Sequence, residues 1–322
     1  MQDFGLQNEV LNTLESSISP LLEQYLKPVE ENWQPADFLP DSRSESFIEE
    51  VREIQELAQG MSYDLLATLI GDTITEEALP SYETWLMSIK GISESQGLSQ
   101  WVRSWTAEEN RHGDLLNRYL YLCGRVDMKQ FEISTQYLIS DGFNTQTGRD
   151  PYESFIFTSF QELATNISHR RVASQVKKLG DDRLSKICGL IAGDEARHAN
   201  AYKKFISIIL EMDPSGTILA FEQMMKKKVV MPAHNLRGQG DAPGKLFDEF
   251  SYAAQRTNVY TTQDYIEILE SLLSEWGIEY LRDLSGDAKR AQDYLMLLPK
   301  RLERISSRMK IPKGEFRFKW IS

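Results

Sequence analysis

Two short stretches of the chain place a glutamate three residues before a histidine, a spacing that could bind a metal ion. They are Glu109 with His112 and Glu195 with His198. In a helix, residues three apart lie on one face, with their Cβ atoms about 5–6 Å apart. Two such pairs in one helical chain predict a dinuclear site built from carboxylates and imidazoles.

Each of these pairs follows another glutamate at the same distance along the chain. Glu76 precedes Glu109 by 33 residues, and Glu162 precedes Glu195 by 33 residues. A four-helix dinuclear site needs one further carboxylate from each of two other helices. The chain therefore predicts a repeated helix pair that supplies four carboxylates and two imidazoles to two cations. Glu77 is an alternative to Glu76 at the first position.

The donor types indicate which metal the site would hold. Oxygen and nitrogen donors without thiolate suit iron or manganese, and do not select copper(I) or structural zinc. Four carboxylates would neutralise two divalent ions, which lowers the cost of burying the charges. A lone Glu-x-x-His pair is more often solvated, but only 4 histidines occur in the chain. Because two of them stand at this spacing, the dinuclear site is the favoured interpretation.

Other residues near the motifs have simpler interpretations than metal binding. Glu108 and Asp194 directly precede the motif glutamates and could be solvated neighbours. His169 follows Glu162 by seven residues on the same helical face, so it could contact the site, although a structural histidine is the preferred interpretation. Three further side chains are expected to belong to the core or the surface: His234, Trp101 and Trp105.

The composition indicates a large apolar core and no membrane span. The chain has 322 residues, of which 41% are hydrophobic, and its longest apolar runs are far too short to cross a bilayer. The first residues show no signal or transit pattern. We therefore expect a soluble protein of the cytoplasm, or a mature form whose targeting segment is absent.

Charge and cysteine content disfavour further classes. The formal net charge of −12 argues against general nucleic-acid binding and makes any local cluster of positive charge informative. The two cysteines, Cys123 and Cys188, are far apart and form no CxxC pair. They fit a reducing compartment and argue against a disulfide framework or a thiolate metal site.

The hydrophobic periodicity predicts a mainly α-helical chain. Residues 8–25 have a helical pattern, but Pro20 and the prolines after it should leave residues 1–43 partly extended. Residues 314–320 alternate apolar and polar side chains and could form a short strand. Helices are predicted at about 44–59, 62–70, 73–90, 98–123, 128–140, 151–179, 182–212 and 214–229, with two or three more over 244–307.

Boundary residues support this layout. Gly71 should close the helix before it, and Pro80 should kink the next one. Asp150 followed by Pro151 is typical of a helix start. We expect a single all-α domain over residues 1–322, in which about 44–230 form the metal-binding core and 231–322 add helices and a basic tail.

In combination, the motifs resemble those of the soluble acyl-[acyl-carrier-protein] desaturases, the plastid stearoyl type and its bacterial relatives. The similarity is dense over residues 32–198 and weaker towards both ends. It rests on these stretches: Asn32-Trp33-Gln34-Pro35 with Phe38-Leu39-Pro40-Asp41; Gly71-Asp72 with Ile74-Thr75-Glu76-Glu77-Ala78-Leu79-Pro80; Trp105-Thr106-Ala107-Glu108-Glu109-Asn110-Arg111-His112-Gly113-Asp114-Leu115-Leu116; Gly124-Arg125-Val126-Asp127-Met128; Phe160-Gln161-Glu162 with Ala164-Thr165 and Ile167-Ser168-His169; and Asp194-Glu195-Ala196-Arg197-His198.

The resemblance implies a ferritin-like helical bundle whose four-helix core holds two iron ions, with additional helices around it, and a homodimer. It places Thr165 beside the position where oxygen binds. It also implies that electrons travel inward through Trp33 and Asp194 to His112. The implied iron ligands are the residues proposed from the spacing: Glu76, Glu109, His112, Glu162, Glu195 and His198.

The family reaction inserts a cis double bond into a saturated acyl chain on acyl carrier protein, with O₂ and electrons from reduced ferredoxin. For this chain the resemblance implies a stearoyl Δ9-type reaction in fatty acid biosynthesis, in the bacterial cytoplasm or the plastid stroma. An unactivated methylene has no acidity, so the cofactor must carry the chemistry while the protein positions the chain and excludes water. The alternatives are another ferritin-like di-iron oxidase or hydroxylase, or a non-enzymatic iron-binding helical protein.

The acyl chain would need a bent apolar channel beside the metal. In the family, the helix that follows the first glutamate ligand lines this channel. The residues at helical spacing there are Tyr82, Trp85, Ser88 and Ile89, and the alternative interpretation is that they belong to the core. Trp85 is bulkier than the methionine expected at its position, so the preferred chain length could differ.

Acyl carrier protein is acidic, and this chain is acidic as well, so docking would need a local basic patch. Two clusters are candidates, and the sequence does not choose between them. One is the run Lys226-Lys227-Lys228. The other is a basic C-terminal tail formed by Lys300, Arg301, Arg304, Arg308, Lys310, Lys313, Arg317 and Lys319.

Overall fold

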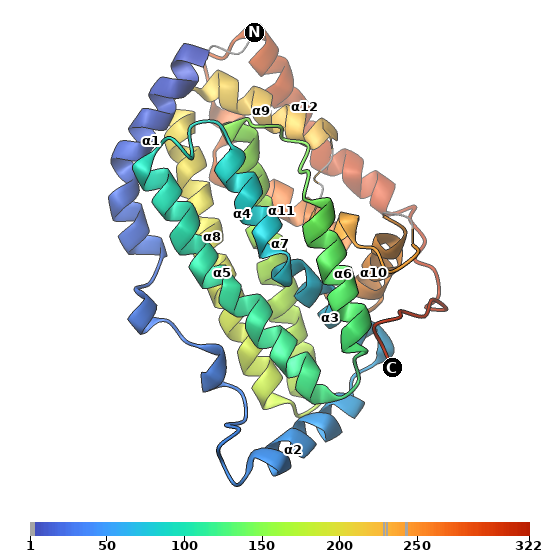
Figure 1. Ribbon diagram of the computed structural model, residues 1–322. Helices are drawn as coiled ribbons and strands as arrows, with labels where there is room; N and C mark the ends of the chain where they lie inside the picture. Colours follow the sequence, from blue (N-terminus) through green and yellow to red (C-terminus); the bar gives the residue numbers. More distant parts are fainter. Residues whose placement is uncertain (1–3, 228, 230, 242–243) are drawn as a thin grey trace.

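The chain is all-α in the part that this computed structural model describes, which is residues 4–227, 229, 231–241 and 244–322 (Figure 1). Twelve α-helices lie in these residues. They contain no β-strand, and the one strand-like pairing is an isolated bridge between Val126 and Ile321. None of the helices described is long and apolar enough to cross a membrane. The predicted fold class is therefore confirmed.

The helices that carry the motifs form two neighbouring pairs at the centre of the molecule (Figure 1). In the first pair, α5 (Gln96–Cys123) packs against α3 (Tyr63–Glu77). In the second pair, α8 (Asp182–Met212) packs against α7 (Pro151–Lys178) along their whole length. Helix α5 also contacts α8. The repeat predicted from the spacing of 33 residues is thus a repeat of two helix pairs.

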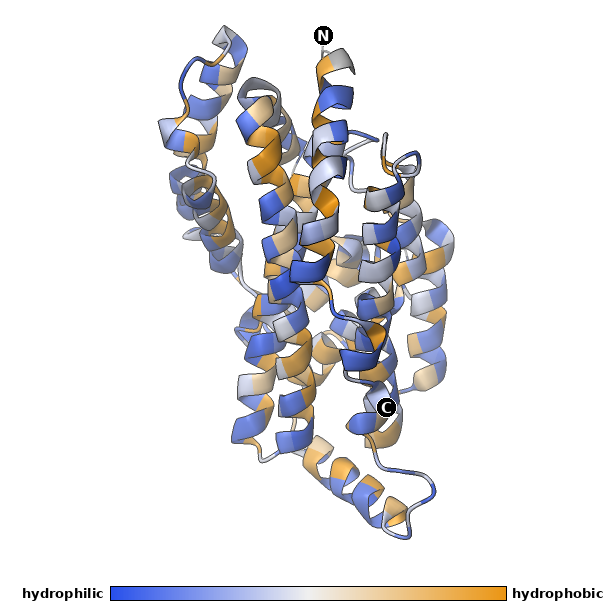
Figure 2. Cartoon of the chain, turned by 90° about the vertical axis from the view of Figure 1, so that its left-hand side faces the viewer, coloured by the Kyte–Doolittle hydropathy of each residue, from blue (hydrophilic) through white to orange (hydrophobic). Residues whose placement is uncertain are grey.

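Outer helices cover this core. Helix α1 packs along α5 and α8, α9 and α11 pack on α7, and α12 covers α9 and α11. Figure 2 shows hydrophobic and hydrophilic residues alternating around the helices, as expected for helices with one buried face. The outer helices are α1 (Phe4–Tyr25), α2 (Phe47–Gln59), α6 (Met128–Asp141), α9 (Pro214–Lys227), α10 (Lys245–Arg256), α11 (Thr262–Glu275) and α12 (Gly286–Ser306).

Local signals set the ends of the long helices. The Asp150 carboxylate accepts a hydrogen bond from the backbone of Glu153 at 2.9 Å, and Pro151 is the first residue of α7. Asp181 caps α8 in the same way. Gly124 ends α5 with a φ of 69°, a conformation that glycine adopts without strain. These predicted boundaries are confirmed, and they place both motifs in the middle of long helices.

The boundary between α3 and α4 (Leu79–Ser88) differs from the prediction. Gly71 lies inside α3 and does not end it. A Cβ at this position would come within 2.2 Å of the Phe250 ring of α10, so glycine is needed here for the close packing of the two helices. The chain breaks at Ala78 instead, and Pro80 occupies the first turn of α4, where its missing N–H is tolerated. This break leaves Glu76 in the last turn of α3.

Two other predictions are wrong. Pro20 lies inside α1, which continues to Tyr25, because the buried face of α1 packs on α5 and α8 and outweighs one lost hydrogen bond. The segment 314–320 is not a strand. Its apolar residues are held by burial: Trp320 is 1% exposed and donates its indole N–H to Ser134 Oγ at 2.8 Å.

Candidate metal centre

The six predicted ligands form two overlapping groups of four between α3, α5, α7 and α8. Within each group, one ligand atom from every residue lies within 4.8 Å of the others. The groups are Glu76, Glu109, His112 and Glu195, and Glu109, Glu162, Glu195 and His198. Both histidines are completely buried. The structure therefore brings together the residues that the sequence spacing selected, and it offers two adjacent cation positions.

Glu109 and Glu195 belong to both groups, so they lie between the two positions. His112 Nδ1 lies 3.2 Å from a Glu109 oxygen and 3.1 Å from a Glu195 oxygen. On the other side, His198 Nδ1 lies 2.5 Å from the second Glu109 oxygen. The two remaining glutamates each belong to one group only. This arrangement could hold two neighbouring ions, with Glu109 and Glu195 within reach of both positions.

Five of these ligand atoms are buried and have no hydrogen-bond partner among the described residues except one another. Such atoms are costly to bury unless something satisfies them. The five atoms all belong to the two groups, so one pair of cations would satisfy them together, and their oxygen and nitrogen types fit iron. They are Glu109 Oε1, Glu162 Oε2, Glu195 Oε1, His112 Nδ1 and His198 Nδ1.

The charges of the metal-free cluster are in conflict. Burial raises the pKa of Glu76 from 4.5 to about 7, although a hydrogen bond with His169 opposes the rise. Burial and the charge of Glu195 hold the pKa of Glu162 well above its ordinary value. Burial acts on Glu109 as well, but the charges of the two histidines outweigh it and lower its pKa. Two divalent cations would remove the conflict and allow all four carboxylates to ionise.

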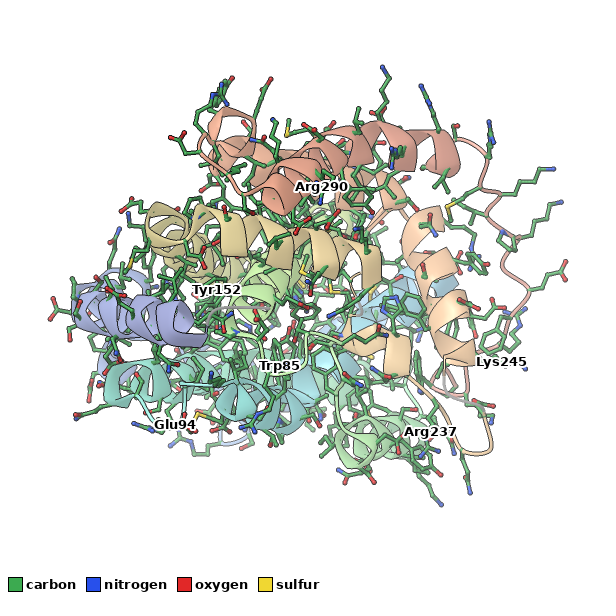
Figure 3. All side chains as sticks on the ribbon, turned by 90° about the horizontal axis from the view of Figure 1, so that it is seen from above. Trp85, Glu94, Tyr152, Arg237, Lys245 and Arg290 are labelled. Atoms are coloured by element: carbon green, nitrogen blue, oxygen red, sulfur yellow. The ribbon has the colours of Figure 1, made fainter. Side chains whose placement is uncertain are left out.

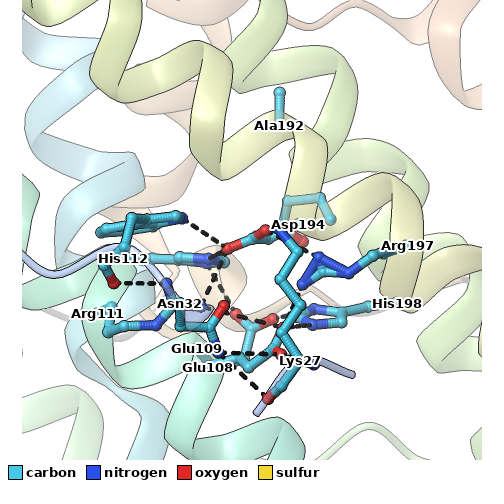
Figure 4. Close-up of polar contacts among 12 residues, drawn as sticks. Lys27, Asn32, Glu108, Glu109, Arg111, His112, Ala192, Asp194, Arg197 and His198 are labelled. Atoms are coloured by element: carbon cyan, nitrogen blue, oxygen red, sulfur yellow. Dashed lines mark hydrogen bonds and ion pairs between the residues drawn. The ribbon is translucent and has the colours of Figure 1, made fainter. Parts of the chain in front are cut away.

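Glu108 and Asp194 are not solvated neighbours. Glu108 Oε2 lies 2.9 Å from His198 Nε2, and Asp194 Oδ2 lies 3.4 Å from His112 Nε2 (Figure 4). Burial tends to raise the pKa of each carboxyl, but hydrogen bonding to its histidine lowers it to about 2. Each carboxylate thus contacts the histidine of the other motif helix. With Nε2 engaged, Nδ1 of each ring faces the metal cluster.

Two arginines join these outer carboxylates. Arg197 donates to Glu108, and to Asp194 at 3.0 Å. Arg111 donates to Asp194 at 3.1 Å and is itself 6% exposed. Buried carboxylates need such partners, since a lone buried charge is strongly destabilising. The arginines therefore stabilise the second layer of contacts around both histidines.

The motif spacing alone missed these four outer residues, and only Asp194 was identified, through the family resemblance, although the sequence carries a signal for all four. The two motifs share a longer pattern, in which an acid precedes the glutamate and an arginine precedes the histidine. It reads Glu108-Glu109-Asn110-Arg111-His112 in α5 and Asp194-Glu195-Ala196-Arg197-His198 in α8. Because the whole five-residue pattern repeats, all of its charged positions could have been assigned to the site.

Trp33 links this network to the exterior. Its indole N–H donates to Asp194 Oδ2 at 3.0 Å. Its ring stacks on His112, with centroids 6.0 Å apart and planes 12° apart, and the Arg111 guanidinium lies 4.2 Å from the centroid of the indole ring. The side chain is partly exposed. The three residues proposed as an electron path, Trp33, Asp194 and His112, are therefore in contact.

The alternatives near the first ligand are now distinguishable. His169 Nε2 lies 2.9 Å from Glu76 Oε1, so this histidine contacts a predicted ligand and is more than a structural residue. Glu77 lies outside both ligand groups. His234 stacks on Phe247, with ring centroids 3.8 Å apart, away from the cluster. Trp101 is a core residue.

A small cavity of about 30 Å³ adjoins the ligands. Thr165 lines it and donates its hydroxyl hydrogen to Glu195 Oε2 at 2.5 Å. Trp105 and Pro232 lie on other walls, and Trp105 is therefore both a core residue and a lining residue. The walls also include four of the glutamates, so a molecule in this cavity would lie directly against the metal ligands.

Of the four predicted channel residues, only Tyr82 lines this cavity. Trp85 packs edge-on against Tyr82 and against Phe157, with centroids 5.4 Å apart in both cases, and lies in the interior of the molecule (Figure 3). Ile89 is completely buried, and Ser88 donates to the Trp85 carbonyl at 2.7 Å. An aromatic cluster therefore fills the space beyond Tyr82.

Comparison with known proteins bears directly on these observations. The family model described as "Fatty acid desaturase" matches residues 6–322. Stearoyl-[acyl-carrier-protein] 9-desaturase 1, chloroplastic, of Arabidopsis thaliana is 49% identical over 97% of this chain and 81% of its own length. Stearoyl-[acyl-carrier-protein] 9-desaturase, chloroplastic, of Ricinus communis is 50% identical over 93% of this chain and 76% of its own length.

A solved structure shares the fold. The X-ray structure of DesA2 from Mycobacterium tuberculosis superposes with a TM-score of 0.57, covering 88% of this chain and 99% of that one. The sequences are 16% identical, so the likeness concerns the arrangement of helices alone.

Proposed function

The chain belongs to the acyl-[acyl-carrier-protein] desaturase family, and from this premise we propose that it inserts a cis double bond into a saturated acyl chain carried by acyl carrier protein, with a stearoyl Δ9-type preference. The observation that carries this proposal is the buried set of four glutamates and two histidines in two overlapping groups. Its support from relatives is about 49% identity over nearly the whole chain to proteins named stearoyl 9-desaturases. The enzyme is accordingly an oxidoreductase.

The proposed cofactor is a pair of iron ions. Glu109 and Glu195 would help to hold both ions, since both belong to the two groups of ligands. Iron held there would supply, with O₂ and two electrons, the oxidising power that an unactivated methylene requires. The other four ligands would complete the two coordination sets: Glu76 and His112 on one side, Glu162 and His198 on the other.

The residues around the cavity would orient and protect the reacting groups. Thr165 holds one oxygen of Glu195 and faces the cavity, so its hydroxyl can hold or pass a proton beside the metal. The apolar part of the cavity wall, which includes Leu79, Tyr82, Trp105 and Pro232, would face the acyl chain and help to keep water from the reacting carbons. The small size of the cavity means that the aromatic cluster near Trp85 must move to admit the part of a stearoyl chain beyond the reacting carbons.

Electrons would enter through the partly exposed Trp33. Its hydrogen bond to Asp194 and the contact of Asp194 with His112 form a continuous path from the exterior to a ligand. The proposed donor is reduced ferredoxin, by resemblance to the family. The family resemblance also supports a homodimer, which sedimentation analysis of the purified protein would test.

The acyl carrier protein would dock on a basic surface that unites the two clusters noted in the sequence. Lys226 Nζ lies 5.2 Å from the centroid of the Tyr294 ring, and the Arg301 guanidinium lies 5.7 Å from it, so the end of α9 meets α12. Lys228 lies outside the described residues. Lys227 is five residues before Pro232, which lines the cavity, so their Cα atoms are at most about 18 Å apart.

The C-terminal cations of this surface are available for an acidic partner, whereas Lys226 and Lys227 are paired with Glu222 and Glu153. No carboxylate of the described residues lies within 4.0 Å of the basic groups from Lys300 to Lys313, and these side chains are exposed. Charge reversal at Lys300 and Arg304 should raise KM for acyl carrier protein and weaken its dependence on salt. An unchanged KM would exclude this docking site.

The proposed function has a direct test. The protein should purify with two iron ions and convert stearoyl-acyl carrier protein to a monounsaturated product with O₂ and reduced ferredoxin. Gas chromatography of products from stearoyl and palmitoyl substrates would give both the bond position and the preferred length. Iron without a new double bond would favour a hydroxylase or an iron-binding protein instead.

A further inference from the structure

The N-terminal segment that follows α1 lies across the outer side of the metal centre and bonds to its second layer of charges. The backbone N–H of Lys27 donates to Glu108 Oε1 at 2.7 Å, and the Asn32 side-chain amide donates to the same oxygen at 3.3 Å. Arg197 donates its Nε–H to the Tyr25 carbonyl at 3.2 Å. We name residues 25–33 the N-terminal strap.

The Glu108 carboxylate is hydrogen-bonded on both of its oxygens, by the strap, Arg197 and His198. Lys27 and Asn32 hold one carboxylate oxygen, while Arg197 and His198 hold the other. Glu108 is 2% exposed, so it has no alternative partner in bulk water. A side chain that receives hydrogen bonds on both oxygens from four different groups has a single orientation, and that orientation points Oε2 at His198 Nε2.

We propose that Glu108 is the positioning residue of His198, and that the N-terminal strap completes the metal site by holding Glu108 in place. The hydrogen bond of His198 Nε2 to Glu108 fixes the ring so that Nδ1 faces Glu109 and Glu162. Outer partners of this kind fix the tautomer and ring orientation of a histidine ligand. The inference rests on the metal site of the proposed function. It adds Glu108 and the strap, which is distant in the sequence from the ligands, to that site.

The opposite half shows why Glu108 is needed. His112 is held by Asp194, and Asp194 is bonded by Trp33, Arg111 and Arg197. In both halves the strap donates to the outer carboxylate: Trp33 supplies one donor to Asp194, and the Lys27 backbone and the Asn32 side chain supply two donors to Glu108. The strap thus contacts the outer carboxylates of both histidines. On the His198 side it provides no aromatic ring, so its role there is to position Glu108.

The test measures metal affinity instead of turnover. Apo-protein is titrated with Co²⁺, whose absorbance reports each ion that binds, in the wild type and in Glu108→Ala, Glu108→Gln and Asn32→Ala. We expect two ions in the wild type, and a loss of about 10–100-fold in affinity for one of the two in Glu108→Ala. Glu108→Gln should recover part of the loss, since its amide oxygen still accepts from His198. Asn32→Ala should show a smaller loss for the same ion.

The control variant is Asn110→Ala, and three results would contradict the expectation. Asn110→Ala changes an exposed residue on α5 two positions away and should bind both ions as the wild type does. Wild-type affinity for both ions in Glu108→Ala would overturn the inference while leaving the proposed function intact. A wild type that binds no ions would overturn the proposed metal site itself. If Glu108→Ala does not fold, unchanged affinity in both Glu108→Gln and Asn32→Ala would also overturn the inference.

Discussion

The two halves of the metal centre are built from the same five-residue motif but face different surroundings. On the His112 side, the imidazole stacks on the partly exposed Trp33, with centroids 6.0 Å apart. On the His198 side, the nearest tryptophan is Trp105, at 6.3 Å and in an edge-on arrangement. Trp105 is 3% exposed and lines the cavity. The metal ligands are therefore symmetric, while access to them is not.

This difference suggests separate routes for the electrons and for the acyl substrate. Trp33 donates its indole N–H to Asp194, so the His112 half has a bonded path to the exterior. The Trp105 indole N–H has no hydrogen-bond partner among the described residues. We infer that electrons arrive through the first half, while the enclosed cavity that Trp105 lines lies against glutamates of both halves. The following predictions test this contrast between the halves.

The largest effect is expected where the halves share a ligand. Glu109→Ala should abolish the binding of both ions, because Glu109 belongs to both groups. Glu162→Ala should remove only the ion on the His198 side. Metal analysis of the purified variants gives the stoichiometry, and circular dichroism confirms that they fold. One ion retained in Glu109→Ala would show that the two positions are independent.

The electron path should depend on one tryptophan only. Trp33→Phe keeps an aromatic ring but loses the N–H to Asp194, and should slow reduction of the bound iron by ferredoxin about 10–100-fold, the range typical of outer partners. Trp105→Phe should leave this rate nearly unchanged. Stopped-flow absorbance without acyl substrate measures it. Equal slowing in both variants would remove the proposed asymmetry.

Metal binding to the apo-protein should strengthen as pH rises through about 7. Burial holds a proton on Glu76 up to a pKa of about 7, instead of 4.5, and that proton must leave before the carboxylate binds a cation. Burial lowers the pKa values of His112 and His198, but the charge of Glu109 outweighs it, so both histidines also hold protons that a metal must displace. Calorimetric titration across this range should show affinity rising by at least about tenfold per pH unit, the change that corresponds to one released proton.

The same shift has a consequence for stability. The folded apo-protein binds a proton on Glu76 that the unfolded chain releases near its ordinary pKa of 4.5, so the contribution of Glu76 to folding falls between pH 4.5 and about 7. Divalent metal should abolish this loss. A metal affinity that does not change with pH would contradict both statements.

The smallest effect concerns the substrate side. Trp85→Ala should shift the ratio of activities towards longer acyl chains by up to about tenfold, the lower end of what one methylene contributes in an apolar pocket. Trp85 fills space against Tyr82 and Phe157, so its removal opens room beyond the cavity. Because loss of a buried tryptophan costs about 3–5 kcal/mol of stability, Trp85→Met serves as a milder variant. Identical ratios across acyl lengths would refute this role.

Much of the site was predictable because its determinants are local. The side chains of Glu109 and His112 share a helix face by the geometry of the helix alone, and the repeat at Glu195 and His198 doubles the signal. Helix starts such as Asp150 were predictable for the same reason, since a cap acts within three residues. The break at Ala78 was not, because the role of Gly71 depends on Phe250 from a distant helix.

The sequence by itself determined the type, number and helical spacing of the metal ligands, since these follow from short-range helix geometry. The family resemblance linked Asp194 to His112, but only the tertiary structure decided that Glu108 serves His198, because that contact crosses between α5 and α8. It also decided that the strap lies on one side and the closed aromatic cluster on the other. Those contacts join residues far apart in the chain, and no local pattern records them.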